Sequence, residues 1–418
     1  MGIINWIRDY WRDIRKSAKN TFKNVVLTAH FWVILIAVAI IISMSVMIFN
    51  TLNGRRDQYL NEVWQNGGKI SYRQMSVFAK GNRVDNTYPL TSLGEGNSIT
   101  LKDVEDIRES LQGTVDSGKG SGGKKKKSKS TGPVGWEDCY STTFSSSGIY
   151  QKTITVNGVE KTGYIDFDAD IVAVGGNFKA FHPFEFMDGG FLPENEYDKN
   201  QIVINDELAW KLFKSYSVSG KKVQLFGEEM TIVGVIREKK TKIDEITGSG
   251  KYRVFCYFSK IDQLSEKGYF SPGGNTGEDF YATPLAITCY EAFLPEAVKG
   301  VAKSDMLNAL PSYNVSEPQY RIVSNTGRFR VDNVYDQVMP IGEFNSKTAG
   351  YEFPYWEKAS ILATERLFFF EAALLIGIIL LIIGIIIMIL RLRKPGGKFD
   401  RIEEPEEALN EVYVEPTY

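Results

Sequence analysis

Two long apolar runs divide the chain into segments of different character. Residues 32–49 contain no charged side chain, and residues 367–390 contain one, Glu371, about one turn from the start of the run. Eighteen or more consecutive apolar residues suffice for a helix to cross a bilayer. Near the end of such a helix a carboxylate reaches the interface at little cost. The pattern therefore predicts two transmembrane helices, at 31–50 and at 367–390.

Other interpretations of these runs fit less well. A cleavable signal peptide would need a small-residue cleavage site after the first run, but none follows Phe49. A buried core helix in place of the second run would not need so many nearly unbroken aliphatic residues. A functional buried acid at Glu371 is the alternative to an interfacial one. Membrane spanning is favoured for both runs.

Basic residues flank both runs on one side. The first thirty residues contain six Lys and Arg against two Asp, and five more Lys and Arg lie between residues 391 and 401. Basic residues close to a span mark its cytoplasmic end. We therefore expect a two-pass protein of the cell membrane, with both termini in the cytoplasm and residues 51–366 outside.

The two cytoplasmic ends differ in pattern. Residues 1–30 predict an amphipathic helix with separate apolar and basic faces. Such a helix lies on the lipid bilayer with Trp at headgroup depth, or docks against a cytoplasmic partner, and the two uses are compatible. Residues 391–418 become strongly acidic and predict a disordered tail. The residues expected to make the docking contacts are Trp6, Trp11, Arg12, Arg15 and Lys16.

Small residues recur at helix-packing spacing in both predicted spans. They allow the backbone of another helix to approach closely. Two spans do not enclose a pathway, so transport would need further helices from another chain or copy. The positions are Ala39 and Ser43 in the first span, and Ala373, Gly377 and Gly384 in the second.

Between the spans the pattern changes to short alternating runs mixed with helical periods. Helices are expected at 101–111, 207–213 and 295–310, residues 51–66 should extend the first span as a stalk, and residues 113–135 should form a flexible Gly/Ser/Lys loop. This mixture predicts an α+β extracytoplasmic domain. The expected strands are 69–78, 152–156, 164–167, 171–174, 201–204, 222–226, 230–236, 252–258 and 285–290.

The amino-acid composition argues against two classes of function, nucleic-acid binding and metal binding. The 418 residues carry 49 Lys and Arg against 51 Asp and Glu, a formal charge of −2, so bulk charge indicates no nucleic-acid partner. Three cysteines are too few for a four-cysteine zinc site, and a mixed site would need both His30 and His182. We therefore expect no metal site. One disulfide is possible, and the pattern favours Cys256 with Cys289, because both lie in strand-like runs.

No catalytic or nucleotide motif is complete. Residues 118–125 approach the phosphate-loop pattern, but Lys125 stands where a Ser or Thr would coordinate the metal ion. His182 lies among phenylalanines without an identifiable nucleophile, which favours a packed or surface histidine. The acidic alternation at 166–170 lacks the turn glycine and the later Glu of a calcium loop. We expect no cofactor and no enzymatic activity.

Three stretches combine strand patterns with characteristic turn residues. They are 171–192 (IVAVGGNFKAFHPFEFMDGGFL), 201–213 (QIVINDELAWKLF) and 218–235 (VSGKKVQLFGEEMTIVGV), and the stalk sequence at 60–70 has the same character. Together they resemble the outer core domain of MacB-like and FtsX-like ABC transporter permeases. The resemblance implies a MacB-like core with a porter-like α/β lobe and a β-rich lobe. Its motifs are packing and turn residues, so they specify fold more than substrate.

The resemblance also implies a function. Permeases of this family work with a cytoplasmic ATPase, whose motion passes through the stalks to the outer domain and its peptide, lipid or protein client. They typically have four spans, so two spans imply a half-size subunit that needs a second permease-like protein or another copy of itself. The alternative is a stand-alone two-pass receptor without an ATPase. A membrane-anchored enzyme is disfavoured by the absent catalytic constellation.

Overall fold

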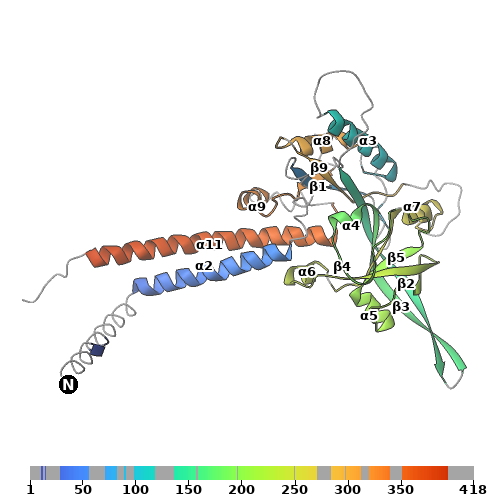
Figure 1. The fold of residues 1–418 in the computed structure, drawn as a ribbon, viewed down its shortest axis with the longest axis horizontal. Helices are drawn as coiled ribbons and strands as arrows, with labels where there is room; N and C mark the ends of the chain where they lie inside the picture. The colour runs from blue at the N-terminus through green and yellow to red at the C-terminus, as the bar shows by residue number, and fades with distance from the viewer. Residues whose placement is uncertain are drawn as a thin grey trace, which may run out of the picture. The chain divides into compact units, whose positions relative to one another are not determined.

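The chain forms two compact units, one of residues 48–369 and one of residues 1–47 with 370–418 (Figure 1). Most of the predicted stalk, the greater part of the Gly/Ser/Lys loop and nearly all of the acidic tail lie outside the described residues. The computed structural model describes residues 11–12, 15, 29–55, 71–81, 89–90, 98–117, 136–156, 159–194, 196–248, 250–270, 284–296, 298–311, 320–338 and 351–393.

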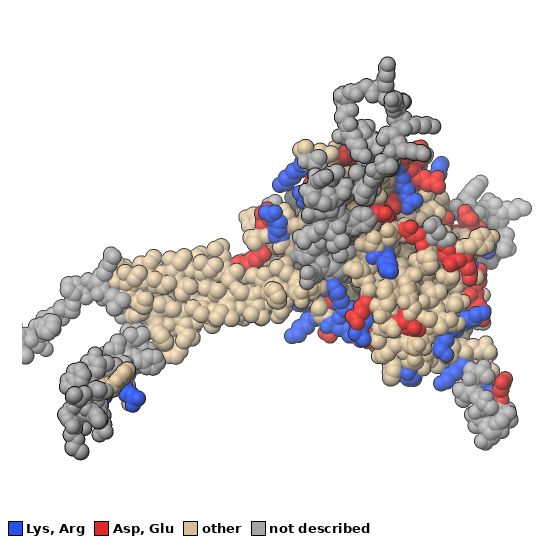
Figure 2. Space-filling view, viewed as in Figure 1, with Lys and Arg blue, Asp and Glu red and all other residues tan. Residues whose placement is uncertain are grey.

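Two helices of the described chain are long and apolar enough to cross a membrane. Helix α2 covers Ala29–Gly54 and helix α11 covers Tyr355–Arg393. Both extend beyond the predicted spans, because neither contains proline and the helical pattern continues into polar sequence. Large apolar side chains such as Trp32 and Ile382 are exposed along them. Figure 2 shows almost no charge on the surface of these helices, as expected for a lipid environment.

Two glycines of α11 let α2 approach closely. A Cβ added to Gly377 would lie 3.0 Å from Cγ2 of Ile40, and one added to Gly384 would lie 2.7 Å from Cγ1 of Ile34. Ala373 is partly buried on the same helix. In α2, however, Ala39 and Ser43 are exposed, whereas Ala37 is fully buried. The contact stripe of α2 therefore follows Ile34, Ala37 and Ile41, and the predicted small residues of α2 lie on another face.

We call residues 48–369 the outer unit, and its described residues are built on one sheet of ten strands. Its order is β10-β1-β9-β2-β3-β8-β5-β7-β4, and β6 pairs with β2 and β7. Most neighbours are antiparallel, but β3 with β8 and β5 with β7 are parallel. The two lobes implied by the family resemblance thus share a continuous sheet. The strands are β1 (Tyr72–Ala79), β2 (Glu137–Val156), β3 (Val159–Gly176), β4 (Glu185–Gly189), β5 (Gln201–Asn205), β6 (Lys222–Leu225), β7 (Glu228–Arg237), β8 (Arg253–Tyr257), β9 (Cys289–Pro295) and β10 (Tyr320–Ser324).

Helices cover both faces of this sheet, so a strand such as β8 is buried along its whole length (Figure 1). Val254 and Cys256 of β8 join one hydrophobic core, and Phe255 and Tyr257 join the other. The first core also includes residues of α3 (Leu101–Ser117), α5 (Asp206–Phe213), α7 (Phe258–Glu266) and α8 (Val301–Ala309). The second core includes α4 (Phe178–Phe181) and the start of α11, and we call this side of the sheet the α4 face.

The β2–β3 hairpin is the longest strand pairing, and it extends beyond the sheet (Figure 1). The predicted strands 152–156, 164–167 and 171–174 are parts of this one hairpin. In the sequence, polar residues and glycines separate these three runs and predict turns between them. At Gly148, however, the ring of the opposite Phe167 covers the backbone, and a Cβ there would lie 2.4 Å from the ring. This glycine accommodates an aromatic ring without ending the strand.

Element boundaries differ most near residue 290. The expected strand 285–290 lies instead at Cys289–Pro295, where β9 pairs with β1 and β2. The expected helix 295–310 therefore begins only at Val301. This apolar run is buried on both faces, so it has no alternation from which the strand ends could be read.

Two glycine motifs that carry the family resemblance meet in space. Gly189 of β4 pairs with Gly234 of β7. A Cβ on Gly234 would lie 2.1 Å from the carbonyl oxygen of Gly190, and a Cβ on Gly189 would lie 2.0 Å from that of Val233. The D-G-G segment at the end of β4 and the V-G-V segment of β7 therefore pack backbone against backbone. Only glycine fits at such a contact.

Replacing Gly234 with Ala should destabilise the outer unit by roughly 1–3 kcal/mol, because the new methyl group overlaps main-chain atoms that cannot rotate away. Gly190→Ala is the matched control, since a Cβ at Gly190 meets no atom within 4 Å. Thermal unfolding followed by circular dichroism should show a lower midpoint for Gly234→Ala only. Equal midpoints for the two variants would contradict the backbone contact.

Candidate functional site

Within the outer unit, the ends of α2 and α11 are inserted among the other elements. We call residues 48–54 of α2 with the following Arg55, and residues 355–369 of α11, the helix bases. Trp356, in the first turn of α11, packs its ring against His182 and Phe178, with centroid distances of 4.6 and 5.7 Å. The guanidinium of Arg253 in β8 stacks on the ring of Tyr355 at 3.7 Å. Aromatic contacts thus attach the start of α11 to the α4 face.

A buried ion pair fixes the same helical turn. Arg328 donates from Nη1 and Nη2 to the two carboxylate oxygens of Glu357, at 2.6 and 2.8 Å. Both side chains are at most 2% exposed. Arg328 precedes helix α9 (Val331–Val338), so the pair links α11 to that segment. The position of Glu357 in the first turn also suits the positive end of the helix dipole.

A second buried pair fixes the end of α2. Arg55 directly follows the helix, is 3% exposed, and donates to the carboxylate of Asp244. Asp244 also forms a capping box with Thr241 at the start of helix α6 (Lys242–Thr247). One carboxylate therefore both begins α6 and holds the outer end of α2.

An apolar cluster joins the two helix bases. Ile48 and Leu52 of α2 pack against a cluster that contains Ala359, Ala363 and Leu367 of α11. The small side chains of Ala359 and Ala363 permit close approach at successive helical turns. Other members of the cluster come from α6, from α9 and from the segment that precedes α9: Ile243, Val334 and Phe329.

A pocket of about 600 Å³ adjoins the helix bases and is lined by charged residues of both signs. Three of its cationic side chains have acidic partners, so their positive charge is already compensated without an anionic ligand. Burial raises the pKa of Glu238 in this pocket, although the neighbouring Arg253 opposes the shift. The pairs are Arg55 with Asp244, Arg237 with Glu185, and Lys240 with Glu207.

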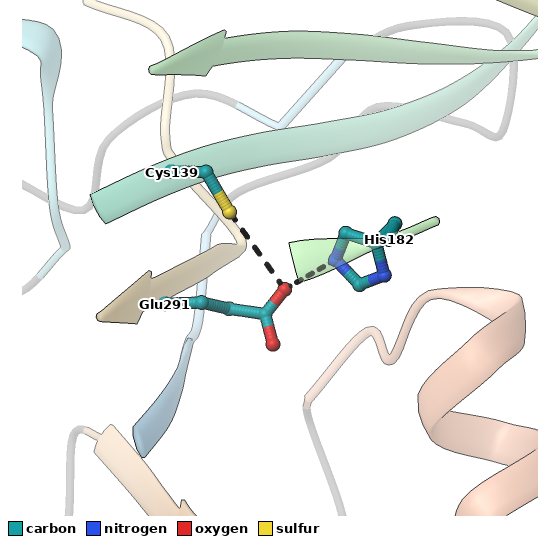
Figure 3. A group of neighbouring side chains, drawn as sticks. All are labelled: Cys139, His182 and Glu291. Carbon is teal, nitrogen blue, oxygen red and sulfur yellow. Dashed lines mark hydrogen bonds and ion pairs between the residues drawn. The ribbon is translucent and has the colours of Figure 1, made fainter. Parts of the chain in front are cut away.

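Three side chains with metal-ligating atoms meet next to this pocket (Figure 3). His182, which follows α4 and lines the pocket, places Nε2 at 2.5 Å from Oε2 of Glu291. The Sγ atom of Cys139 lies 3.9 Å from the same oxygen. Burial, followed by the charge of Glu291, raises the pKa of the Cys139 thiol well above its ordinary value. Among the described residues, these three could hold a metal ion.

Sequence reasoning missed this cluster. Cys139 and Glu291 are 152 residues apart and meet only because β2 pairs with β9. We expected no metal site because the sequence has too few cysteines and histidines for a zinc site made of these residues alone. A carboxylate ligand was not considered. No local pattern in the sequence joins the three residues.

The predicted disulfide between Cys256 and Cys289 is wrong. All three cysteines are unpaired and buried. Cys256 lies on β8 and Cys289 on β9, and two strands separate them in the sheet. At about 4.8 Å per strand their Cα atoms are roughly 14 Å apart, about twice the reach of a disulfide. A strand-like pattern does not reveal which strands become neighbours.

The predicted cytoplasmic docking residues are only partly described. Trp11, Arg12 and Arg15 are helical, and Trp11 is exposed. Trp6 and Lys16 lie outside the described residues. These positions remain predicted contacts for lipid or a partner.

Comparison with known proteins identifies a family. The family model described as MacB-like periplasmic core domain matches residues 32–271 and confirms the resemblance found in the sequence. The extracellular domain of the noncanonic ABC-type transporter YknZ from Gram-positive bacteria aligns over 60% of this chain and 99% of its own, with 14% identity and a TM-score of 0.35. The periplasmic region of MacB from Actinobacillus actinomycetemcomitans aligns over 67% and 98%, with 12% identity and a TM-score of 0.35. Among curated protein sequences, none matches.

Replacing Glu357 with Gln should destabilise the outer unit by about 3–5 kcal/mol, because Arg328 would remain buried without its counter-charge. The matched control is Asp332→Asn, which breaks the exposed pair with Arg330 and should cost about 0–1 kcal/mol. Urea unfolding of both variants in detergent measures the difference. A loss in Glu357→Gln no greater than in the control would show that the buried pair does not hold the helix.

Proposed function

The chain belongs to the family of MacB-like periplasmic core domains, and from that premise we propose that it is a non-catalytic membrane subunit of an ABC-type transporter complex. Two apolar helices agree with the membrane location of this family. In the proposed mechanism a separate cytoplasmic ATPase hydrolyses ATP and moves the helices. The helices relay that motion to the outer unit, which handles a peptide, lipid or protein client.

The unbroken course of α11 is the observation that carries this proposal. The helix contains 39 residues from Tyr355 to Arg393, a length of about 58 Å at 1.5 Å per residue. It begins among buried residues of the outer unit and continues through the whole apolar run. Because it has no proline, its backbone hydrogen bonds oppose sharp bending. A shift or rotation applied to one end therefore reaches the other end.

The helix bases support a relay because each is fixed by buried groups. Moving α11 displaces Trp356 and Glu357, and with them α4 and the segment before α9. Moving α2 displaces Arg55 and the start of α6. Separating either ion pair would leave a buried charge uncompensated, at a cost of several kcal/mol. The elements are thus expected to follow the helices.

Two further contacts complete the proposed assembly. The basic face of the N-terminal helix, including Arg12, Arg15 and Lys16, would dock against the ATPase and the anionic bilayer surface. A second permease-like protein or another copy of this chain would pack against the membrane helices. Gly377 and Gly384 already accommodate α2. The exposed Ala39 and Ser43, four residues apart, are therefore the better candidates for that partner.

The proposed topology places both termini in the cytoplasm and residues 51–366 outside. The native thiols are buried, so an added cysteine is the reactive one in labelling experiments. In intact cells a membrane-impermeant maleimide should label Ser128→Cys in the Gly/Ser/Lys loop. Lys398→Cys in the acidic tail should be labelled only after permeabilisation. The reverse pattern would refute the topology.

Crosslinking in native membranes followed by affinity purification tests the assembly. The wild-type chain should recover a nucleotide-binding subunit and a membrane partner. Reversing Arg12, Arg15 and Lys16 to Glu should reduce recovery of the ATPase at least several-fold, because each charge near an anionic surface or groove contributes about 1 kcal/mol. The control reverses three lysines of the outer loop, Lys124, Lys125 and Lys126.

The same experiment tests the membrane contact separately. Ala39→Leu with Ser43→Leu should reduce recovery of the membrane partner by blocking close helix approach. Ala372→Leu adds similar bulk at an exposed position of α11 and should have little effect. Recovery of neither partner from wild-type membranes, under conditions that preserve other transporters, would instead support a stand-alone receptor.

A further inference from the structure

Rigid elements hold the three donor residues that meet beside the pocket. Cys139 and Glu291 are directly opposed on β2 and β9, so both side chains project from the α4 face. The residue His182 ends the α4 turn, where its backbone N–H donates to the carbonyl of Phe178 at 3.0 Å. Their ligating atoms all lie within 4.8 Å of one another. Ligands positioned by paired strands and a short helix need little reorganisation to bind an ion.

A second layer of contacts orients these ligands. Ser76 donates from Oγ to Oε1 of Glu291 at 2.6 Å, and Asn325 donates from Nδ2 to that hydroxyl at 2.7 Å. Oε2 of Glu291 is the oxygen that contacts His182 and Cys139. Outer hydrogen bonds of this kind fix the orientation of metal ligands in protein sites.

The charge of Glu291 also favours a cation. Its carboxylate is 2% exposed. Within the part of the chain that the structure describes, its side-chain hydrogen-bond partners are Ser76, Cys139 and His182, and none of these is Lys or Arg. A buried carboxylate needs a compensating positive charge. A divalent ion bound by one carboxylate, one thiolate and one neutral imidazole would make the site neutral overall.

We infer that Cys139, His182 and Glu291 bind a divalent transition-metal ion of the Zn²⁺ type. Sulfur and imidazole ligands suit Zn²⁺, whereas Ca²⁺ and Mg²⁺ prefer oxygen ligands alone. Three protein ligands leave a fourth position for water, and the pocket beside His182 provides access for both the ion and that water. The site is additional to the proposed relay and does not depend on it.

The distances define how the site must adjust. Ligand atoms of a tetrahedral zinc site lie roughly 3.3–3.6 Å apart. The 3.9 Å between Sγ of Cys139 and Oε2 of Glu291 is already close to this spacing. The 2.5 Å between His182 and Glu291 is shorter, so the imidazole has to withdraw by about 1 Å when the ion enters. His182 borders the pocket, which leaves room for this movement.

Cobalt titration of the full-length protein in detergent tests the site. The protein is purified without a polyhistidine tag, treated with a chelator and titrated with Co²⁺, an absorbing substitute for Zn²⁺. We expect one ion per chain and a thiolate-to-cobalt charge-transfer band, because a cysteine ligand produces that band. Zn²⁺ should remove the band and raise the thermal unfolding midpoint, and Mg²⁺ should do neither.

Single substitutions identify the ligands. Cys139→Ser, His182→Gln and Glu291→Gln should each weaken Co²⁺ binding by about 100-fold or more, since loss of a ligand exceeds the 10–100-fold effect of losing an outer contact. Cys139→Ser should also abolish the charge-transfer band. The matched controls are Cys256→Ser and Cys289→Ser, which remove the other buried thiols and should retain both binding and the band.

Two results would overturn the assignment. One is the absence of the band in wild-type protein at Co²⁺ concentrations that fill ordinary zinc sites, which would leave a metal-free His182–Glu291 pair. The other is Co²⁺ binding that persists unchanged in all three ligand variants. Circular dichroism identifies any variant that fails to fold, and the wild-type titration then decides the question.

Discussion

A carboxylate buried at the start of a long apolar helix needs a buried cation, and this requirement shapes the surroundings of α11. Arg328 satisfies Glu357 with two hydrogen bonds, which places the segment before α9 against the helix. Trp356 then lies on α4, and the small residues that follow receive α2. A solvated loop would hold the start of α11 less firmly than this buried pair does. The pair fixes residues 355–369 of α11 within the outer unit.

Patterns that depend on local chemistry predicted much of this fold. The two long apolar helices were predicted because each contains an uninterrupted apolar run. Strands β5 and β7 were predicted because short apolar runs are bounded by turn residues. The start of α11 was missed because its first turns carry Glu357, Lys358 and Glu365, which end the apolar run without ending the helix. The hydropathy of the sequence reveals only the apolar part of a helix. The full length of the helix also depends on the helix propensity and packing of the polar residues beside that part.

The groups at the helix bases could not be predicted in the same way. Arg55 and Asp244 are 189 residues apart in the sequence. Considered alone, each is a charged residue of a type that usually lies on the protein surface. Their burial follows from the order in which strands and helices assemble, which no periodicity encodes. The cluster of Cys139, His182 and Glu291 has the same origin. A turn glycine such as Gly189 was informative because its left-handed backbone conformation is a local constraint.

The contact between Gly234 and Gly190 has a consequence for how this family is recognised. It consists of main-chain atoms that lie too close for a Cβ at position 234, so the requirement for glycine there does not depend on the exposed side chains of the outer unit. Exposed side chains can be exchanged around it while the same fold persists. Membership therefore defines a scaffold, and it leaves exposed surfaces such as the arms of the β2–β3 hairpin unconstrained.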